Sequence, residues 1–299
     1  MKRMKKYIII IFASLFLVDN MSANKIKDVK TLSATYTYRG PDNVSMADAK
    51  RIAIERAKIQ ALADEYGTAL SQTNSSNTSN ANGHSNVNFH SVGLSEVKGI
   101  WLEDVDDPVF TLTTYEQDMV VVSVKVKGKT CAVKHSDIDL KISLLRNGTD
   151  RKFQSLDYVH GDQLRILFQT PVDGYLAVYQ QDEDGNVFCL LPYPEQNGIA
   201  YKVAANKEYL LFDPEADCAG ADGAYVMEYE MLANRELESN EIYVLFSPNQ
   251  FSKAADNFRD KILPRELSID KFQKWMARCR LNDEQMQLSR FSIKIKKSE

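Results

Sequence analysis

The alternation of hydrophobic and polar positions in the first half predicts several strands and one long helix. Residues 31–38 are rich in β-branched and aromatic types, and further strands are expected at 92–102, 109–115 and 119–127. In the last of these, valines occupy every even position from 120 to 126, so one face should be buried. The pattern therefore predicts a small α+β domain over residues 24–134.

The helix of this domain should begin at the capping box Ser45–Asp48 and end at Gly67, because glycine permits the left-handed backbone of a helix end. Alanines recur every fourth residue from Ala49 to Ala61, a spacing that lets a helix lie close on a sheet. Residues 71–88 are mostly Ser, Asn, Thr and Gly, and this composition predicts a loop.

Short strand patterns at regular spacing in the second half are typical of a β-sandwich. The expected strands are 138–145, 163–169, 174–181, 186–191, 208–212, 224–230, 241–247 and 287–296. Asp184-Gly185 lies between two of them and predicts a tight hairpin, because such turns need a positive φ. An apolar stripe predicts a C-terminal helix at about 268–280. We therefore expect an α+β chain whose β-sandwich domain spans residues 138–299.

The N-terminus has the order of a secretory signal peptide over residues 1–23. Four basic residues precede the apolar run 7–18, and Met21-Ser22-Ala23 offers a small-residue cleavage site. The run is shorter than the roughly 20 residues that cross a bilayer, so we expect cleavage, with retention as an anchor the alternative, and no stable membrane span afterwards. The first cysteine is Cys131, which excludes lipidation beside the cleavage point. The mature protein is expected in the periplasm or in association with the outer membrane.

Charge argues against nucleic acid as a partner. Removing residues 1–23, which carry four basic residues and one acidic residue, lowers the formal net charge from −4 to −7. A mildly acidic protein does not attract a polyanion. The apolar content of 44% is sufficient to fill the cores of two domains.

Four cysteines form an even set in a chain that we expect to be exported: Cys131, Cys189, Cys218 and Cys279. Their spacing contains no Cys-x-x-Cys, so neither a zinc site nor a redox motif is expected. We favour buried or free thiols over any bridge. If a bridge exists, Cys189–Cys218 is the expected pair, because both residues lie in the same predicted domain.

No residue pattern indicates catalysis or a cofactor. His135-Ser136-Asp137 places the residue types of a catalytic triad side by side, but adjacent side chains of an extended chain point to opposite faces. Gly128-Lys129-Thr130 lacks the earlier glycine of a phosphate-binding loop, since Ser123 stands at that position. The acidic cluster 103–107 allows a calcium site or a solvated turn. We therefore predict a protein that is not an enzyme and has no metal or cofactor.

Aromatic residues at or near strand ends are the remaining candidates for ligand or partner contacts. They are Trp101, Tyr175, Tyr179, Tyr193 and Tyr201. Such rings can stack on sugars or anchor a protein partner. The alternative is that they fill the core of the sandwich.

Four motifs in order resemble the domain-of-unknown-function family numbered 4384. They are Gly161-Asp162-Gln163-Leu164, Asp173-Gly174-Tyr175-Leu176, Asp182-Glu183-Asp184-Gly185 and Leu190-Leu191-Pro192-Tyr193. The resemblance covers roughly residues 140–248, and Glu238–Glu241 stands where the family has a Gly-x-Glu motif. It implies a β-rich, envelope-exposed module with no established enzymatic role.

The first half resembles the N-terminal module of flagellar assembly protein T and of related small outer-membrane lipoproteins. The similarity lies in the alanine-rich helix 47–66, Gly67, the Ser/Asn loop and Gly99. It implies a periplasmic assembly module, and the two resemblances together imply an envelope protein of a Gram-negative bacterium. We therefore expect an interaction or assembly module that binds envelope proteins through strand edges and aromatic patches. The alternative is a periplasmic module that binds a glycan or another small ligand.

Overall fold

A computed structural model of the chain confirms the predicted α+β fold, which is mostly β-sheet with two α-helices among the described residues. The predicted signal peptide and most of the predicted loop 71–88 lie outside those residues. The structure describes residues 28–41, 45–68, 80–81, 84–85, 97–116, 119–134, 136–193, 201–215, 226–252, 254 and 264–297.

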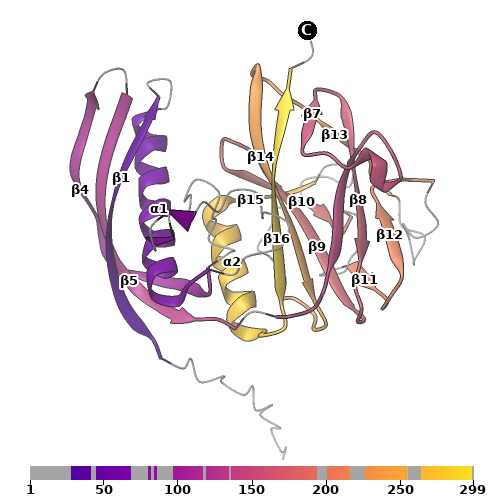
Figure 1. Cartoon of the computed structure of the whole chain (residues 1–299), viewed down its shortest axis with the longest axis horizontal. Helices are drawn as coiled ribbons and strands as arrows, with labels where there is room; N and C mark the ends of the chain where they lie inside the picture. The colour runs from indigo at the N-terminus through magenta and orange to yellow at the C-terminus, as the bar shows by residue number, and fades with distance from the viewer. Residues whose placement is uncertain are drawn as a thin grey trace, which may run out of the picture.

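The N-terminal part is an antiparallel three-stranded sheet with a helix on one face (Figure 1). Its strand order is β1 (Lys30–Pro41), β5 (Met119–Ala132) and β4 (Gly99–Glu116). The helix α1 (Met46–Tyr66) begins and ends where the sequence predicts, and Gly67 follows it with a φ of +77°. A short pairing of β2 (Asn80–Ala81) with β3 (His84–Ser85) lies within the predicted loop.

The alanine stripe of α1 packs directly on the valine face of β5. Ala49, Ala53 and Ala57 are fully buried against the even-numbered valines from Val120 to Val126. Because alanine carries a single methyl group, the helix backbone lies close to the sheet. The predicted spacing of small residues is therefore confirmed as a packing surface.

One long strand replaces two of the predicted strands. The segments expected at 92–102 and 109–115 belong, as far as they are described, to the single strand β4, and the acidic cluster 103–107 lies inside it instead of in a turn. The pairing of β4 with β5 shifts register at several points between Trp101 and Leu112. These bulges accommodate the acidic residues and Pro108 without ending the strand.

The C-terminal part is a sandwich of two sheets, and the predicted domain boundary falls between β5 and its first strand, β6 (Lys141–Arg146). The larger sheet has the order β15 (Arg265–Ser268), β10 (Asn186–Leu191), β9 (Gly174–Gln181), β14 (Leu237–Ser247), β16 (Gln287–Lys296) and β7 (Asp157–Val159), with β11 (Tyr201–Val203) also paired to β9. The smaller sheet has the order β12 (Glu208–Leu211), β8 (Asp162–Gln169) and β13 (Tyr229–Met231), with β6 also paired to β8. A single 3₁₀ turn, η2 (Arg151–Phe153), follows β6. The sequence did not predict β7, β11 and β15, which are three or four residues long.

The larger sheet contributes buried residues from both of its faces along β9, β10 and β14. Leu176 and Val178 of β9 point into the core between the two sheets, whereas Ala177 and Tyr179 point to the opposite face. The second helix, α2 (Ile269–Asn282), covers that opposite face with its own apolar stripe. The stripe consists of Phe272, Trp275, Met276 and Cys279. The sandwich is therefore a three-layer arrangement of helix, sheet and sheet (Figure 1).

We expect Ala53→Leu to destabilise the protein by about 1–3 kcal/mol, because the added carbons have no space between α1 and β5. Ala47→Leu is the matched control, since Ala47 is exposed on the same helix. Urea denaturation followed by circular dichroism measures both free energies of unfolding. Equal stability of the two variants would contradict the close packing of the alanine stripe.

Candidate functional site

Three of the five aromatic residues predicted as contacts are core residues. Tyr179, Tyr193 and Tyr201 are at most 4% exposed. Tyr179 packs under α2, with ring centroids 4.9 Å from Phe272 and 5.2 Å from Trp275. The predicted contact role is wrong for these three, because α2 and the second sheet cover the faces that the strand pattern left open.

Tyr193 and Tyr201 pack edge to face, at 6.5 Å between centroids, inside the sandwich. The fourth candidate, Tyr175, is half-buried against the cluster beneath α2.

The fifth candidate, Trp101, is half-buried on β4 and is held by groups of the protein itself. Its ring lies so close to Gly128 of β5 that a Cβ there would be 2.3 Å from it. Its Nε1 donates a hydrogen bond to Asp104 Oδ1 at 2.8 Å, and Lys58 Nζ of α1 lies 5.3 Å from the ring centroid. Lys58 also forms an ion pair with Asp104 at 2.8 Å. Trp101 therefore fastens α1 to β4 and does not present a free stacking face.

A cavity of about 650 Å³ lies between β4 and α2. We call it the β4–α2 cavity. Its wall on the first side comes from residues 99–104 of β4 and from Lys58 of α1. Its wall on the second side is the face of α2 that points away from the sandwich, and it consists of Asp270, Gln273, Lys274, Met276, Ala277, Arg278, Arg280 and Leu281. Figure 1 shows α2 on the side of the sandwich that faces the N-terminal part.

Three contacts hold the two parts together beside this cavity. Arg280 Nη2 donates a hydrogen bond to the carbonyl oxygen of Val97 at 3.0 Å. Lys134 forms an ion pair with Glu284 at 2.6 Å, and Gln287 Nε2 donates to the carbonyl oxygen of Ser136, in the segment between the two parts, at 2.7 Å. Burial lowers the pKa of Arg280 to about 10, so its guanidinium group still carries a charge at neutral pH.

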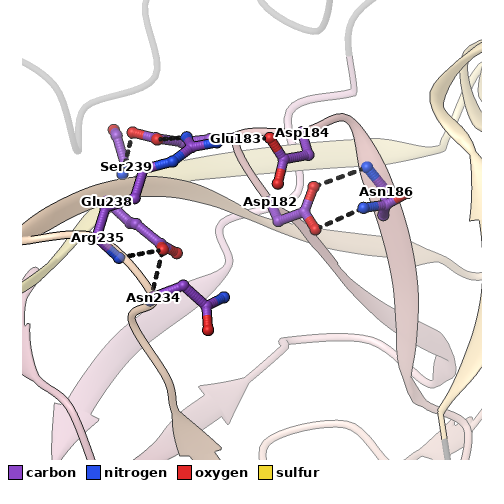
Figure 2. Close-up of polar contacts among 8 residues, drawn as sticks. All are labelled: Asp182, Glu183, Asp184, Asn186, Asn234, Arg235, Glu238 and Ser239. Atoms are coloured by element: carbon purple, nitrogen blue, oxygen red, sulfur yellow. Dashed lines mark hydrogen bonds and ion pairs between the residues drawn. The ribbon is translucent and has the colours of Figure 1, made fainter.

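The acidic hairpin between β9 and β10 is a structural feature (Figure 2). Gly185 has the positive φ, +82°, that the sequence predicts for this turn. Asp182 accepts hydrogen bonds from the backbone and side-chain nitrogens of Asn186, at 2.7 and 2.8 Å. Because both of its oxygens are engaged within the turn, Asp182 closes the hairpin.

The same hairpin is tied to the loop that precedes β14. Glu183 accepts from the backbone N–H of Ser239 at 2.7 Å, and Arg235 bridges Glu183 at 2.7 Å and Asp184 at 2.9 Å. The side-chain hydrogen bonds with Asp184 and Glu183 raise the pKa of Arg235. The buried Glu238 accepts from the backbone N–H groups of Asn234 and Arg235, at 2.6 and 3.0 Å. Figure 2 shows these acids pointing to backbone and side-chain donors of the two loops.

Asp162 of the first motif has a comparable role at the turn between β7 and β8. It is 8% exposed and accepts from the backbone of Val159, from Asn147 Nδ2 and from Arg146 Nε, each at 2.5 Å. Across the described residues, no group of three or more His, Cys, Asp or Glu side chains has the geometry of a metal site.

Three cysteines are buried thiols, namely Cys131, Cys189 and Cys279. Burial raises the pKa of Cys131 and of Cys279. The thiol of Cys189 lies 3.3 Å from Arg265 Nη2 and 3.4 Å from the carbonyl oxygen of Leu191. Cys218 lies outside the described residues, so its bridge to Cys189 stays a prediction.

The outer edge of β4 is the second candidate surface. Among the described strands, only β5 pairs with β4, so the other edge of this 18-residue strand has no strand beside it. Val109 and Leu112 lie opposite Lys125 and Ser123, on the sheet face away from α1, and Val109 is 55% exposed. The segment Val109–Thr113 carries no charge. The order of strands in the sheet leaves this edge of β4 without a described partner strand. No signal in the sequence indicates which strand would be outermost.

Comparisons with protein-family models, with curated proteins and with solved structures found no match for this chain. No described helix combines the length and the apolar character needed to cross a membrane.

We expect Glu238→Ala to destabilise the protein by about 1–3 kcal/mol, because two backbone N–H groups of the loop before β14 lose their acceptor. Glu236→Ala is the control, since Glu236 is exposed two residues away. Chemical denaturation measures both. If the two variants are equally stable, Glu238 does not hold this loop.

We expect stability to fall as pH rises above about 9. Burial raises the pKa of Cys131 and Cys279 above the ordinary 9.0, and that of Tyr158 and Tyr229 above the ordinary 10.0. The folded state therefore keeps protons that the unfolded chain releases, and the free energy of unfolding declines from about pH 9 and more steeply above 10.

Denaturation midpoints at pH 7, 9 and 10.5 measure this decline. Tyr229→Phe should flatten the part above pH 10, because its hydroxyl, which donates to the carbonyl oxygen of Leu190 at 2.8 Å, no longer titrates. A midpoint that does not change between pH 7 and 10.5 would contradict the assignment.

Proposed function

We propose that this protein is an exported, non-enzymatic interaction or assembly module of the cell envelope that binds protein partners through the outer edge of β4. The observation that carries the proposal is the uncharged, partly exposed segment Val109–Thr113 on an edge with no described neighbour. The export signal and the two family resemblances support the location in the periplasm or at the outer membrane of a Gram-negative bacterium.

An exposed strand edge offers a row of backbone donors and acceptors to an extended segment of another protein. Backbone hydrogen bonds then supply affinity, and apolar side chains on alternate positions supply specificity. On β4 these side chains are Val109 and Leu112 on one face and Phe110 on the other. An extended partner segment with apolar residues at alternate positions fits this arrangement.

The first half of the same strand is protected against pairing. Residues 103–107 include four acids, Pro108 lacks an N–H group, and the register shifts between Asp104 and Val109 bend the strand. Acids, proline and bulges are the features by which natural sheets block edge-to-edge association. The acids and the proline end at Pro108, although one more register shift lies between Phe110 and Leu112. The contrast in charge within one strand supports Val109–Thr113 as the docking segment.

A photo-crosslinking residue at Thr111, with the protein expressed in its native host, tests this proposal. We expect a crosslink to a defined envelope protein, and we expect Leu112→Lys to abolish it by placing a charge on the docking segment. Leu237→Lys is the matched control, because Leu237 is an exposed leucine on β14 of the sandwich.

The same crosslinker at Glu230, an exposed residue on β13 of the sandwich, reports contacts that do not depend on the β4 edge. The proposal fails if Thr111 and Glu230 capture the same proteins. It also fails if Leu112→Lys leaves the Thr111 crosslink unchanged.

A small-ligand-binding module is the second candidate function, and the β4–α2 cavity is the observation that favours it. Its volume of about 650 Å³ is within the range of roughly 300–1,000 Å³ that is usual for ligand pockets. Pockets also form preferentially where two domains meet. Stacking on a glycan has less support, because the ring of Trp101 is packed against Gly128 and Lys58.

A further inference from the structure

We propose that the β4–α2 cavity binds a small organic anion, with its carboxylate or phosphate group between Lys274 and Arg278 and its apolar body against the apolar part of the cavity lining. The inference rests on the second candidate function and is independent of the β4 edge.

The lining of the cavity is partly apolar and partly charged. Ile100 and Leu102 of β4 and Ala277 and Leu281 of α2 are its apolar members. The charged side chains Lys274 and Arg278 are exposed, on the same face of α2. A ligand that is apolar at one end and charged at the other matches this division.

Most of the charge in the wall is already neutralised within the protein. Asp104 is paired with Lys58 at 2.8 Å and also accepts from Trp101. Glu103 is paired with Lys129 at 2.6 Å. The charges of these four side chains therefore cancel. They contribute little to whether the cavity prefers a cationic or an anionic ligand.

The charge that is left is positive. Within the described residues, Lys274 and Arg278 form no ion pair, and Asp270 is the one acid of α2 that lines the cavity. Two cationic side chains and one acidic side chain leave a net positive charge, which favours an anionic ligand.

The spacing of the two cations suits one anionic group. Lys274 and Arg278 are four residues apart, so they project from neighbouring turns of α2 with their Cβ atoms roughly 5–6 Å apart. Asp270 is one turn further from Arg278, toward the start of the helix. A carboxylate or phosphate placed between the two cations accepts charge-assisted hydrogen bonds from both.

The helix that carries these residues is held firmly. Phe272, Trp275 and Met276 are buried on the larger sheet, and Trp275 Nε1 donates to the carbonyl oxygen of Ser252 at 2.7 Å. Arg280 fixes the end of the helix to Val97. The cations therefore project from a rigid element, which limits the ordering that a ligand must impose.

Isothermal titration of the protein, purified as its host processes it, tests the proposal with four probes of one chain length: octanoate, octyl phosphate, octanol and octylamine. We expect at least one of the two anions to bind and octylamine, a cation at neutral pH, not to bind. In Lys274→Glu/Arg278→Glu the anion should bind about tenfold more weakly or worse, because both charge-assisted contacts are lost. Lys271→Glu, an exposed lysine of the same helix outside the cavity, should bind as the wild type does.

Ala277→Trp is a second variant that fills the cavity from its α2 wall, and we expect it to abolish binding. Thermal unfolding of each variant checks that the fold is intact. Absence of binding by both anions overturns the proposal, as do equal binding of octylamine, undiminished binding in the double variant and undiminished binding in Ala277→Trp. Because the crosslinking experiment reports only the β4 edge, either proposal can fail without the other.

Discussion

The packing of α2 on the larger sheet is the interaction on which the rest of the structure depends. Its apolar stripe packs on Ala177 and Tyr179 of β9 and on Tyr243 and Leu245 of β14, so these four become core residues. Its opposite face then forms one wall of the β4–α2 cavity, and its last turn donates the Arg280 hydrogen bond to Val97. A helix of 14 residues therefore completes the core of one part and positions the other.

The strand β4 is shared by both candidate surfaces. Its first residues line the β4–α2 cavity, whereas Val109–Thr113 form the exposed end of its outer edge. The acidic residues between them occupy the bulged middle of the strand, where Glu103 and Asp106 pair with Lys129 and Lys127 of β5. Charge pairs across the sheet therefore separate a recessed surface from an exposed one on a single strand.

The motifs that resemble family 4384 support the fold and show no chemistry in the described residues. Asp162, Asp182 and Glu238 each accept hydrogen bonds from backbone or neighbouring side-chain donors at turns of the sandwich. Glu238 stands where the Gly-x-Glu motif is absent, and it still caps the loop before β14. Carboxylates engaged in this way hold the geometry of the loops.

Local patterns in the sequence were enough to predict helices and strands that are long and have a regular spacing of apolar residues. The alanine spacing of α1, the bounds of β9, β10 and β16, and the positive φ of Gly185 all follow from interactions within one or two turns or strands of the chain. Tertiary structure alone decided which face of β9 is covered and which strand of the first sheet is outermost. It also decided that residues far apart in the chain, such as Trp101 of β4 and Lys274 of α2, meet around one cavity. The reason is that burial and strand order depend on contacts between distant segments, and a period read along the chain contains no information about what packs against it.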